Sequence, residues 1–211
     1  MSKTKDREQI ISAICNAAKQ YKQNLIGKKF LFIFESRSIE IVFKKDSFKH
    51  LTGVSSYLSA KQFYKKALNG TLRKEQIWFD KQHPFSLCVR KIKHISNIFQ
   101  ITINECFLLE DINTKTVTYQ FGATNLNFTL CMTSEPNTFD FIIQSLRDED
   151  CFDKASNVYE VVSILSKQND QKLYSNLTYL DKRYSLCNLP NVIKQKIEPS
   201  LFLDNEDNSK Y

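Results

Sequence analysis

Two β-rich segments separated by a short polar link constrain the fold more than any other feature of the sequence. Residues 30–34 form a continuous apolar run, and residues 39–43 form a second β-favouring run after the polar residues 36–38. Two such runs joined by a short link predict a β-hairpin. A strand that is apolar at every position is typical of burial on both faces, so we expect the first strand of this hairpin to be central in a sheet.

Helical periodicity is clearest before and after this hairpin. In residues 6–25 the apolar residues fall on one stripe of a helix, which we expect to stop at Gly27 in a left-handed cap. Ser59 is a typical N-cap for a second helix over residues 60–68. Residues 87–99 fit either a helix or a strand, so the type of this element stays open.

The later part of the chain favours strands. Residues 106–112, 117–121 and 128–133 are short β-favouring runs with turn-forming links, as in an antiparallel meander. Residues 158–165 predict a further buried strand. The order of helix, hairpin, helix and several strands predicts an α+β fold, with the helices packed on one face of an antiparallel β-sheet.

The length and composition fit one compact domain. The 211 residues are 42% apolar and include 16 Phe and 9 Tyr, which is enough for a sizeable core. From residue 198 the chain becomes acidic and poor in apolar residues. We therefore predict a single domain over residues 1–197 and a flexible acidic tail over residues 198–211.

Several classes of site are excluded by what the sequence lacks. With 4 Gly and 4 Pro there is no material for glycine-rich phosphate loops or dinucleotide motifs. The 6 Cys are scattered, without a Cys-x-x-Cys pair or a His at zinc-ligand spacing. We therefore expect no metal, no cofactor, and cysteines that are free and mostly buried. The N-terminus lacks an apolar signal region and no run approaches ~20 apolar residues, so we expect a cytoplasmic protein with no membrane span.

Positive charge is concentrated in the first half of the chain. Residues 1–105 hold 20 Lys and Arg against 8 Asp and Glu, a net charge of +12, whereas residues 106–211 hold 10 against 15, a net charge of −5. A cationic half can attract a polyanion such as nucleic acid. A lysine-rich solvated surface explains the same counts without any partner.

His50 is the strongest candidate for acid/base chemistry among the 3 His of the chain. It follows the hairpin directly and lies between Lys49 and a helix that carries Lys61 and Lys65. An imidazole titrates near neutral pH, so it can take a proton from a ribose 2′-hydroxyl or give one to a departing 5′-oxygen. The neighbouring lysines could bind phosphate, and Phe63, Tyr64 or Trp78 could stack on a base, although a phenylalanine is more simply a core residue. His83 and His94 are more simply interpreted as surface or packing residues.

The segment around His50 also resembles a known family. Phe48-Lys49-His50-Leu51-Thr52-Gly53-Val54, followed by residues 58–68, is similar to a signature of the phage- and mobile-element-associated branch of the barnase, EndoU, colicin and RelE-like (BECR) nucleases. The resemblance extends more weakly over most of the first 185 residues. It implies a small α+β nuclease that cleaves RNA without a metal, often as a toxin or in conflict between mobile elements.

The resemblance also implies roles for individual residues. His50 would be the general acid/base, and Thr52 would donate a hydrogen bond to a phosphate or to the transition state. Ser166 and Lys167, at the end of a late strand, would supply a hydroxyl and a cation. Each has a structural alternative. Leu51 and Val54 could simply bury His50, Thr52 could cap a turn, and the other two could end a strand.

A second function stays open. Residues 111–125, where the family tends to carry glycine-rich and lysine-bearing segments, hold only Lys115 and Gly122. The protein could therefore be an inactive relative that binds nucleic acid, or a protein partner or inhibitor, through its basic half. The nuclease hypothesis requires that the His50 ring be open to solvent and close to cations.

Overall fold

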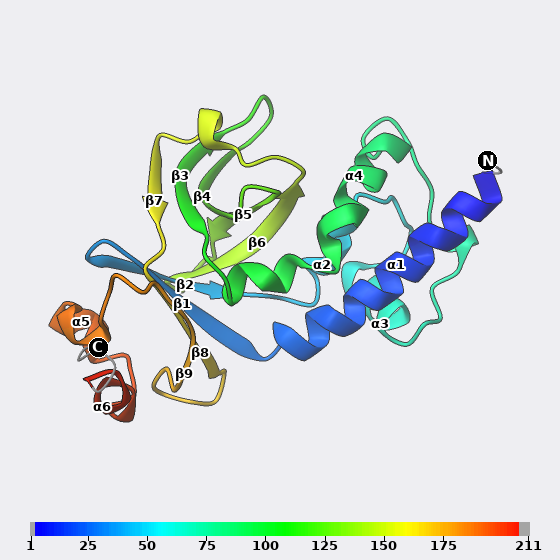
Figure 1. Ribbon diagram of the computed structural model, residues 1–211. Helices are drawn as coiled ribbons and strands as arrows, with labels where there is room; N and C mark the ends of the chain where they lie inside the picture. Colours follow the sequence, from blue (N-terminus) through cyan, green and yellow to red (C-terminus); the bar gives the residue numbers. More distant parts are fainter. Residues whose placement is uncertain (1–2, 207–211) are drawn as a thin grey trace.

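Nine strands form a single curled sheet within residues 3–206, the part of the chain that the computed structural model describes (Figure 1). The strand order is β7-β3-β4-β5-β6-β2-β1-β8-β9. All pairings between these described strands are antiparallel except β2 with β6. The strands are β1 (Lys28–Phe34), β2 (Arg37–Val42), β3 (Phe107–Asn113), β4 (Thr118–Thr124), β5 (Thr129–Ser134), β6 (Asp140–Arg147), β7 (Asn157–Glu160), β8 (Ser163–Gln168) and β9 (Asn176–Leu180).

Six α-helices accompany the sheet in the same part of the chain. They are α1 (Lys3–Asn24), α2 (Phe48–Thr52), α3 (Ala60–Leu68), α4 (Phe85–Ile95), α5 (Asn191–Lys194) and α6 (Ser200–Glu206). Short 3₁₀ turns occur at Lys74–Gln76, Ile98–Thr102, Phe152–Lys154 and Leu186–Asn188. The α+β fold predicted from the sequence is therefore confirmed, and the segment that fitted either helix or strand is helix α4 followed by a 3₁₀ turn.

The predicted hairpin is the β1–β2 pair, and β1 is central as expected, between β2 and β8. Side chains alternate across a strand, so β1 serves two cores. Its three phenylalanines pack in a large core with α1 and the other N-terminal helices, whereas Leu31 and Ile33 pack in a smaller core with Tyr174.

The helices cover both faces of the sheet rather than one. Figure 1 shows α1 to α4 on one side of the molecule and the short α5 and α6 on the other. Ile193 of α5 and the partly buried Leu201 and Phe202 of α6 belong to the smaller core. The expectation of a single covered face was wrong because the continuous apolar run of β1 supplies apolar side chains to both sides.

Helix α1 ends, and helix α3 begins, as the sequence predicts. The apolar stripe of α1 is buried, and Gly27 after it has a left-handed φ of 86°. Ser59 caps α3 through a capping box, in which its hydroxyl accepts a hydrogen bond from the Gln62 N–H and the Gln62 side chain accepts one from the Ser59 N–H.

The single strand predicted over residues 158–165 is wrong, because the chain forms two strands there. β7 lies at one edge of the sheet and β8 lies beside β1, with the buried Val161 and Val162 between them. The Val161 N–H donates to the Cys106 carbonyl, and the Val162 N–H donates to the Ile33 carbonyl. The curl of the sheet thus brings its β7 edge close to β1. Because Val161 and Val162 are as apolar as the two strands, the sequence does not show where β7 ends and β8 begins.

The segment predicted as an acidic tail, residues 198–211, begins with helix α6. Leu201 and Phe202 pack against the domain, so the start of this segment lies on the smaller core. Residues 207–211 lie outside the described residues, and the boundary of the tail stays a prediction. None of the helices in the described part of the chain is both long and apolar enough to cross a membrane.

Candidate functional site

His50 lies on the exposed side of the short helix α2. Phe48 and Leu51, on its other side, are fully buried in the larger core, whereas the His50 side chain is exposed. Helix α2 ends at Gly53, whose φ of 70° is left-handed. The buried pair therefore fixes the helix on the core and presents the imidazole to solvent, as the nuclease hypothesis requires.

The surroundings of His50 favour its neutral form. Partial burial of the ring lowers its pKa below the usual 6.5, and the nearby positive charges of Lys49 and Lys91, together with His83, lower the pKa further. A neutral imidazole at pH 7 can accept a proton.

The Lys49 ammonium group is engaged within the protein. Its Nζ donates to the carbonyl oxygens of Ser56 and Leu58 at 2.8 and 2.7 Å. Lys49 thus holds the chain after α2 against the helix and contributes charge near His50. Its ammonium group has fewer hydrogen bonds left for a phosphate than an exposed lysine would have.

Thr52 is fully buried and its hydroxyl group is used locally. The hydroxyl donates to the Lys49 carbonyl at 2.7 Å and accepts the Val54 N–H at 3.3 Å. With no surface open to a substrate, Thr52 stabilises the turn after His50. This placement corresponds to the structural alternative that the sequence left open for Thr52, and it does not favour direct contact with a phosphate.

Lys91 of α4 is the cation that sequence reasoning missed. Only 8% of the residue is exposed, and its Nζ donates to the His50 carbonyl oxygen at 3.0 Å. It forms no ion pair with a carboxylate in the described residues. Burial first, and then the charge of Arg147, lower its pKa to about 8. Because the periodicity of residues 87–99 fits both a helix and a strand, the sequence does not show that Lys91 faces inward.

The contact between α2 and α4 depends on Gly53. A Cβ atom on this residue would lie 3.0 Å from Lys91 Cδ and 3.3 Å from Cys88 Cα. Gly70 has a similar φ of 68°, but a Cβ there would have no atom within 4 Å. The two glycines therefore have the same backbone strain on substitution and different packing.

We expect Gly53→Ala to lower the free energy of unfolding by about 1–3 kcal/mol more than Gly70→Ala does. Both variants pay the cost of a left-handed alanine, but only Gly53→Ala also pushes α4 away. Urea unfolding of the two variants and the wild type measures the difference. Equal losses in the two variants would show that the approach of α4 to Gly53 is not tight.

A second histidine is organised close to His50. The Ser55 hydroxyl lies 2.6 Å from Asp80 Oδ2 and 3.0 Å from His83 Nδ1. If the hydroxyl donates to the carboxylate, its oxygen accepts from Nδ1–H, and the His83 Nε2 then carries the free lone pair. Asp80 is held by the backbone N–H groups of Gln82 and His83. The chain thus orients the His83 ring through residues that are far apart in the sequence.

Two exposed aromatic rings lie beside this network. Tyr57 and Trp78 are stacked, with centroids 6.4 Å apart and an interplanar angle of 15°. Their exposed fractions are 66% and 39%. The Trp78 Nε1–H donates to Asp80 Oδ2 at 3.2 Å, so the stacked rings are joined to the group that orients His83.

Comparison with known families identifies the chain. A family described as phage-Barnase-EndoU-ColicinE5/D-RelE like nuclease 4 matches residues 13–183, well over half of the 211 residues. The protein belongs to this nuclease family. Membership implies a nucleic-acid substrate. Neither the curated proteins nor the solved structures that we searched contain a match.

In this member of the nuclease family, the side chains of Ser166 and Lys167 are engaged with β9 and with the loop before it. Ser166 is buried in β8 and its hydroxyl accepts a hydrogen bond from Asn176 Nδ2 at 3.0 Å. Lys167 donates to the Lys172 carbonyl, and its Nζ lies 4.6 Å from the centroid of the Tyr174 ring. Tyr174 belongs to the smaller core, whereas α2 packs in the larger core on the opposite face.

The α3 residues of this nuclease are divided between surface and core. Lys61 and Lys65 are exposed and form no ion pair among the described residues, so they are free to contact a polyanion. Tyr64 is only 3% exposed and packs edge-on against Tyr21 and Phe48. The prediction that Tyr64 stacks on a base is therefore wrong, because an aromatic residue on the inner face of α3 contributes to the core.

Among the described residues there is no group of three or more His, Cys, Asp or Glu side chains arranged to hold a metal ion. All six cysteines are free, and four of them are buried.

Proposed function

We propose that the protein is a metal-independent endoribonuclease in which His50 is a general acid/base, acting as a toxin or in conflict between mobile elements. The observation that carries the proposal is the exposed imidazole of His50, with a lowered pKa, on a turn that is bonded to the buried Lys91. Together with membership of a nuclease family, this arrangement suits proton transfer beside a negatively charged strand.

The proposed reaction is attack by the ribose 2′-hydroxyl on the adjacent phosphorus. His50 takes the 2′-hydroxyl proton while the O2′–P bond forms and the P–O5′ bond breaks, which leaves a 2′,3′-cyclic phosphate. A proton must reach the departing 5′-oxygen. We assign this second transfer to the protonated form of His83, in which Nε2–H gives its proton to the 5′-oxygen while Nδ1–H stays bonded to the Ser55 hydroxyl.

Lysine side chains and aromatic rings around the two histidines support binding of single-stranded nucleic acid. Lys91 supplies a positive charge near His50, where negative charge increases in the transition state. The exposed Lys61 and Lys65 extend the positive surface along α3. The exposed pair of Tyr57 and Trp78 provides a stacking surface for a base next to His83.

Cleavage in the presence of a chelator tests the proposal. We expect the purified protein to cut labelled single-stranded RNA in EDTA and to leave 2′,3′-cyclic phosphate ends. A matched strand with a single 2′-deoxynucleotide at the cut site is expected to resist cleavage there, because the nucleophile is missing. Cleavage of the deoxy-substituted site, or 5′-phosphate products, would contradict this mechanism.

A non-cleaving binder of nucleic acid or of a protein partner is the second candidate. It is favoured by the engagement of Lys49 within the protein and by the position of Lys167 on the far face of the sheet. Fewer groups then surround His50 than the family resemblance implies. Salt-sensitive RNA binding without cleavage of any RNA tested would support this candidate.

A further inference from the structure

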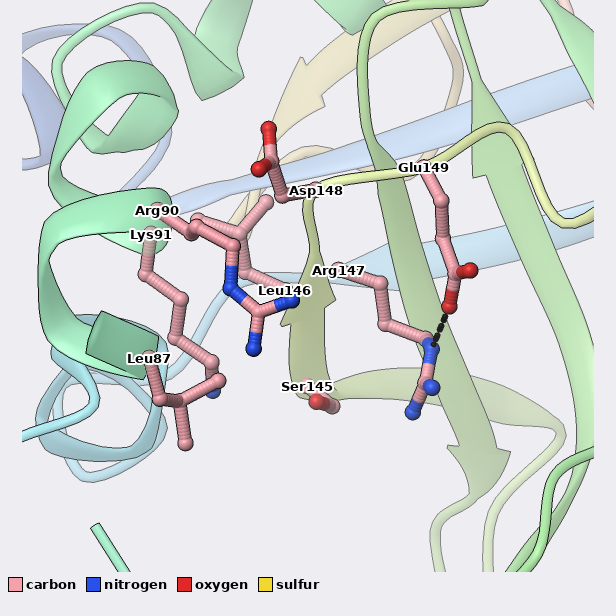
Figure 2. A pocket seen from close by; sticks show the side chains of 8 residues that line it. All are labelled: Leu87, Arg90, Lys91, Ser145, Leu146, Arg147, Asp148 and Glu149. Carbon is pink, nitrogen blue, oxygen red and sulfur yellow. Dashed lines mark hydrogen bonds and ion pairs between the residues drawn. The ribbon is translucent and has the colours of Figure 1, made fainter. Parts of the chain in front are cut away.

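A cavity of about 300 Å³ lies between helix α4 and the end of strand β6. Figure 2 shows Arg90 and Lys91 of α4 on one side and Arg147 on the other, with the side chain of Ser145 between them. A water molecule occupies ~30 Å³ in the liquid, so the cavity has room for a phosphate group and several waters. Lys91 links the cavity to the turn that carries His50, because it lines the cavity and also donates to the His50 backbone carbonyl.

The two carboxylates at the cavity already have hydrogen-bond or ion-pair partners. Glu149 accepts from Arg147 Nε at 2.6 Å and also pairs with Lys154. Asp148 lies 2.5 Å from His94 Nε2 and 3.9 Å from Lys93 Nζ. These contacts leave little negative charge available for the other cations of the cavity.

Arg90 and Lys91 form no ion pair within the described residues. Arg90 is exposed at the mouth, whereas Lys91 is more than nine-tenths buried and has a single hydrogen bond, to the His50 carbonyl. Burying a charge without a counter-ion costs free energy. A bound anion would remove this cost and use the remaining donors of the Lys91 ammonium.

We propose that this cavity binds a phosphodiester group of the nucleic-acid strand, held by Arg90 and Lys91 from α4 and by Arg147 from β6. Phosphate suits the arrangement because its oxygens accept hydrogen bonds from several directions, and arginine can bind two of them at once. The assignment to a strand rests on the proposed function, since a strand that passes His50 brings a neighbouring phosphate to the cavity. A free phosphate or nucleotide shares the same chemistry.

Binding to a strand that cannot be cleaved tests the proposal separately from catalysis. We expect a 2′-O-methyl RNA oligonucleotide to shift the amide resonances of residues 87–91 and 145–149 in NMR titrations. Inorganic phosphate is expected to shift the same resonances at much higher concentration. The variant His50→Ala is expected to bind both probes as the wild type does, so loss of cleavage and loss of this site are distinguishable.

Two variants and one control test whether the oligonucleotide binds in the cavity. Arg90→Gln and Lys91→Met are each expected to weaken oligonucleotide binding about tenfold, as the loss of a charged hydrogen bond predicts. Lys115→Gln, at an exposed lysine of the β3–β4 turn, is expected to change affinity much less. Arg90 is exposed, so its variant tests anion binding without the change in stability that Lys91→Met is expected to bring.

The outcomes separate the sources of the phosphate. Oligonucleotide binding that is equal in wild type, Arg90→Gln and Lys91→Met would overturn the proposal. Inorganic phosphate that shifts the cavity resonances, together with an oligonucleotide that does not, would also overturn it and would assign the cavity to a free phosphate or nucleotide.

Discussion

His50→Ala is expected to lower the rate of RNA cleavage by about 10²–10⁴-fold, the usual contribution of a general acid or base. Affinity for a non-cleavable RNA should stay close to that of the wild type, because the side chain removed is neutral at pH 7 and forms none of the proposed phosphate contacts. The fold should persist, since Phe48 and Leu51 hold α2 on the core and the His50 ring is exposed.

The dependence of cleavage on pH separates the roles of the two histidines. As a base, His50 must be neutral, so the wild-type rate should fall as the pH drops through its lowered pKa, below 6.5. This acid limb should be missing from any residual activity of His50→Ala. His83→Ala should lower the rate but keep this acid limb, because the proposed base is still present. A His50→Ala variant as active as the wild type would end the catalytic assignment.

Lys91→Met is expected to stabilise the protein at pH 7 by on the order of 1–3 kcal/mol while it weakens anion binding. The pKa of Lys91 falls from 10.5 to about 8, which shows that the fold disfavours its charged form. Each pKa unit corresponds to ~1.4 kcal/mol, and loss of the hydrogen bond to the His50 carbonyl offsets ~1 kcal/mol of the gain. Methionine has a similar length and no charge.

This gain in stability should shrink as the pH rises. Between pH 8 and 10.5 the unfolded wild-type chain binds the Lys91 proton more tightly than the folded chain does, so wild-type stability increases with pH. The titratable groups that interact electrostatically with Lys91 are Arg147, Cys131, Cys88 and His50. Burial raises the pKa of the Cys88 thiol to about 12, so this thiol stays neutral at pH 7 and cannot neutralise the lysine.

Urea unfolding of the wild type and Lys91→Met at pH 7 and pH 9.5 measures both effects. Lys115→Met serves as the control, because Lys115 is exposed and its substitution should leave stability nearly unchanged at both values. A Lys91→Met variant that is less stable than the wild type at pH 7 would show that Lys91 is an ordinary structural residue.

The local elements of the fold could be predicted from the sequence to a large extent. Strands β1 and β2 and helix α1 follow from their apolar periodicity, and α3 follows from Ser59 and its apolar face. The break between β7 and β8 could not be predicted, because Val161 and Val162 are as apolar as the strands that they separate. The covering of both sheet faces by helices also depended on long-range packing.

The candidate site was predictable only in its centre. His50 was found from its basic neighbours and the family resemblance, whereas the exposure of its ring, which the nuclease hypothesis requires, was known only from the structure. Three residues that the sequence suggested for the site do not lie at the surface around His50. Thr52 and Tyr64 are buried, and Lys167 lies on the opposite face of the sheet. Conversely, no local pattern of residues connects Ser55 with Asp80 and His83.

The sequence by itself determined the hairpin, the main helices and the choice of His50 as the candidate, because these depend on residues only a few positions apart. The tertiary structure alone decided which groups surround that histidine. Lys91 is 41 residues from His50, and His83 is 28 residues from Ser55. Such pairs meet because separate elements pack on a shared core, and the free energy of that packing depends on the whole fold rather than on any local pattern.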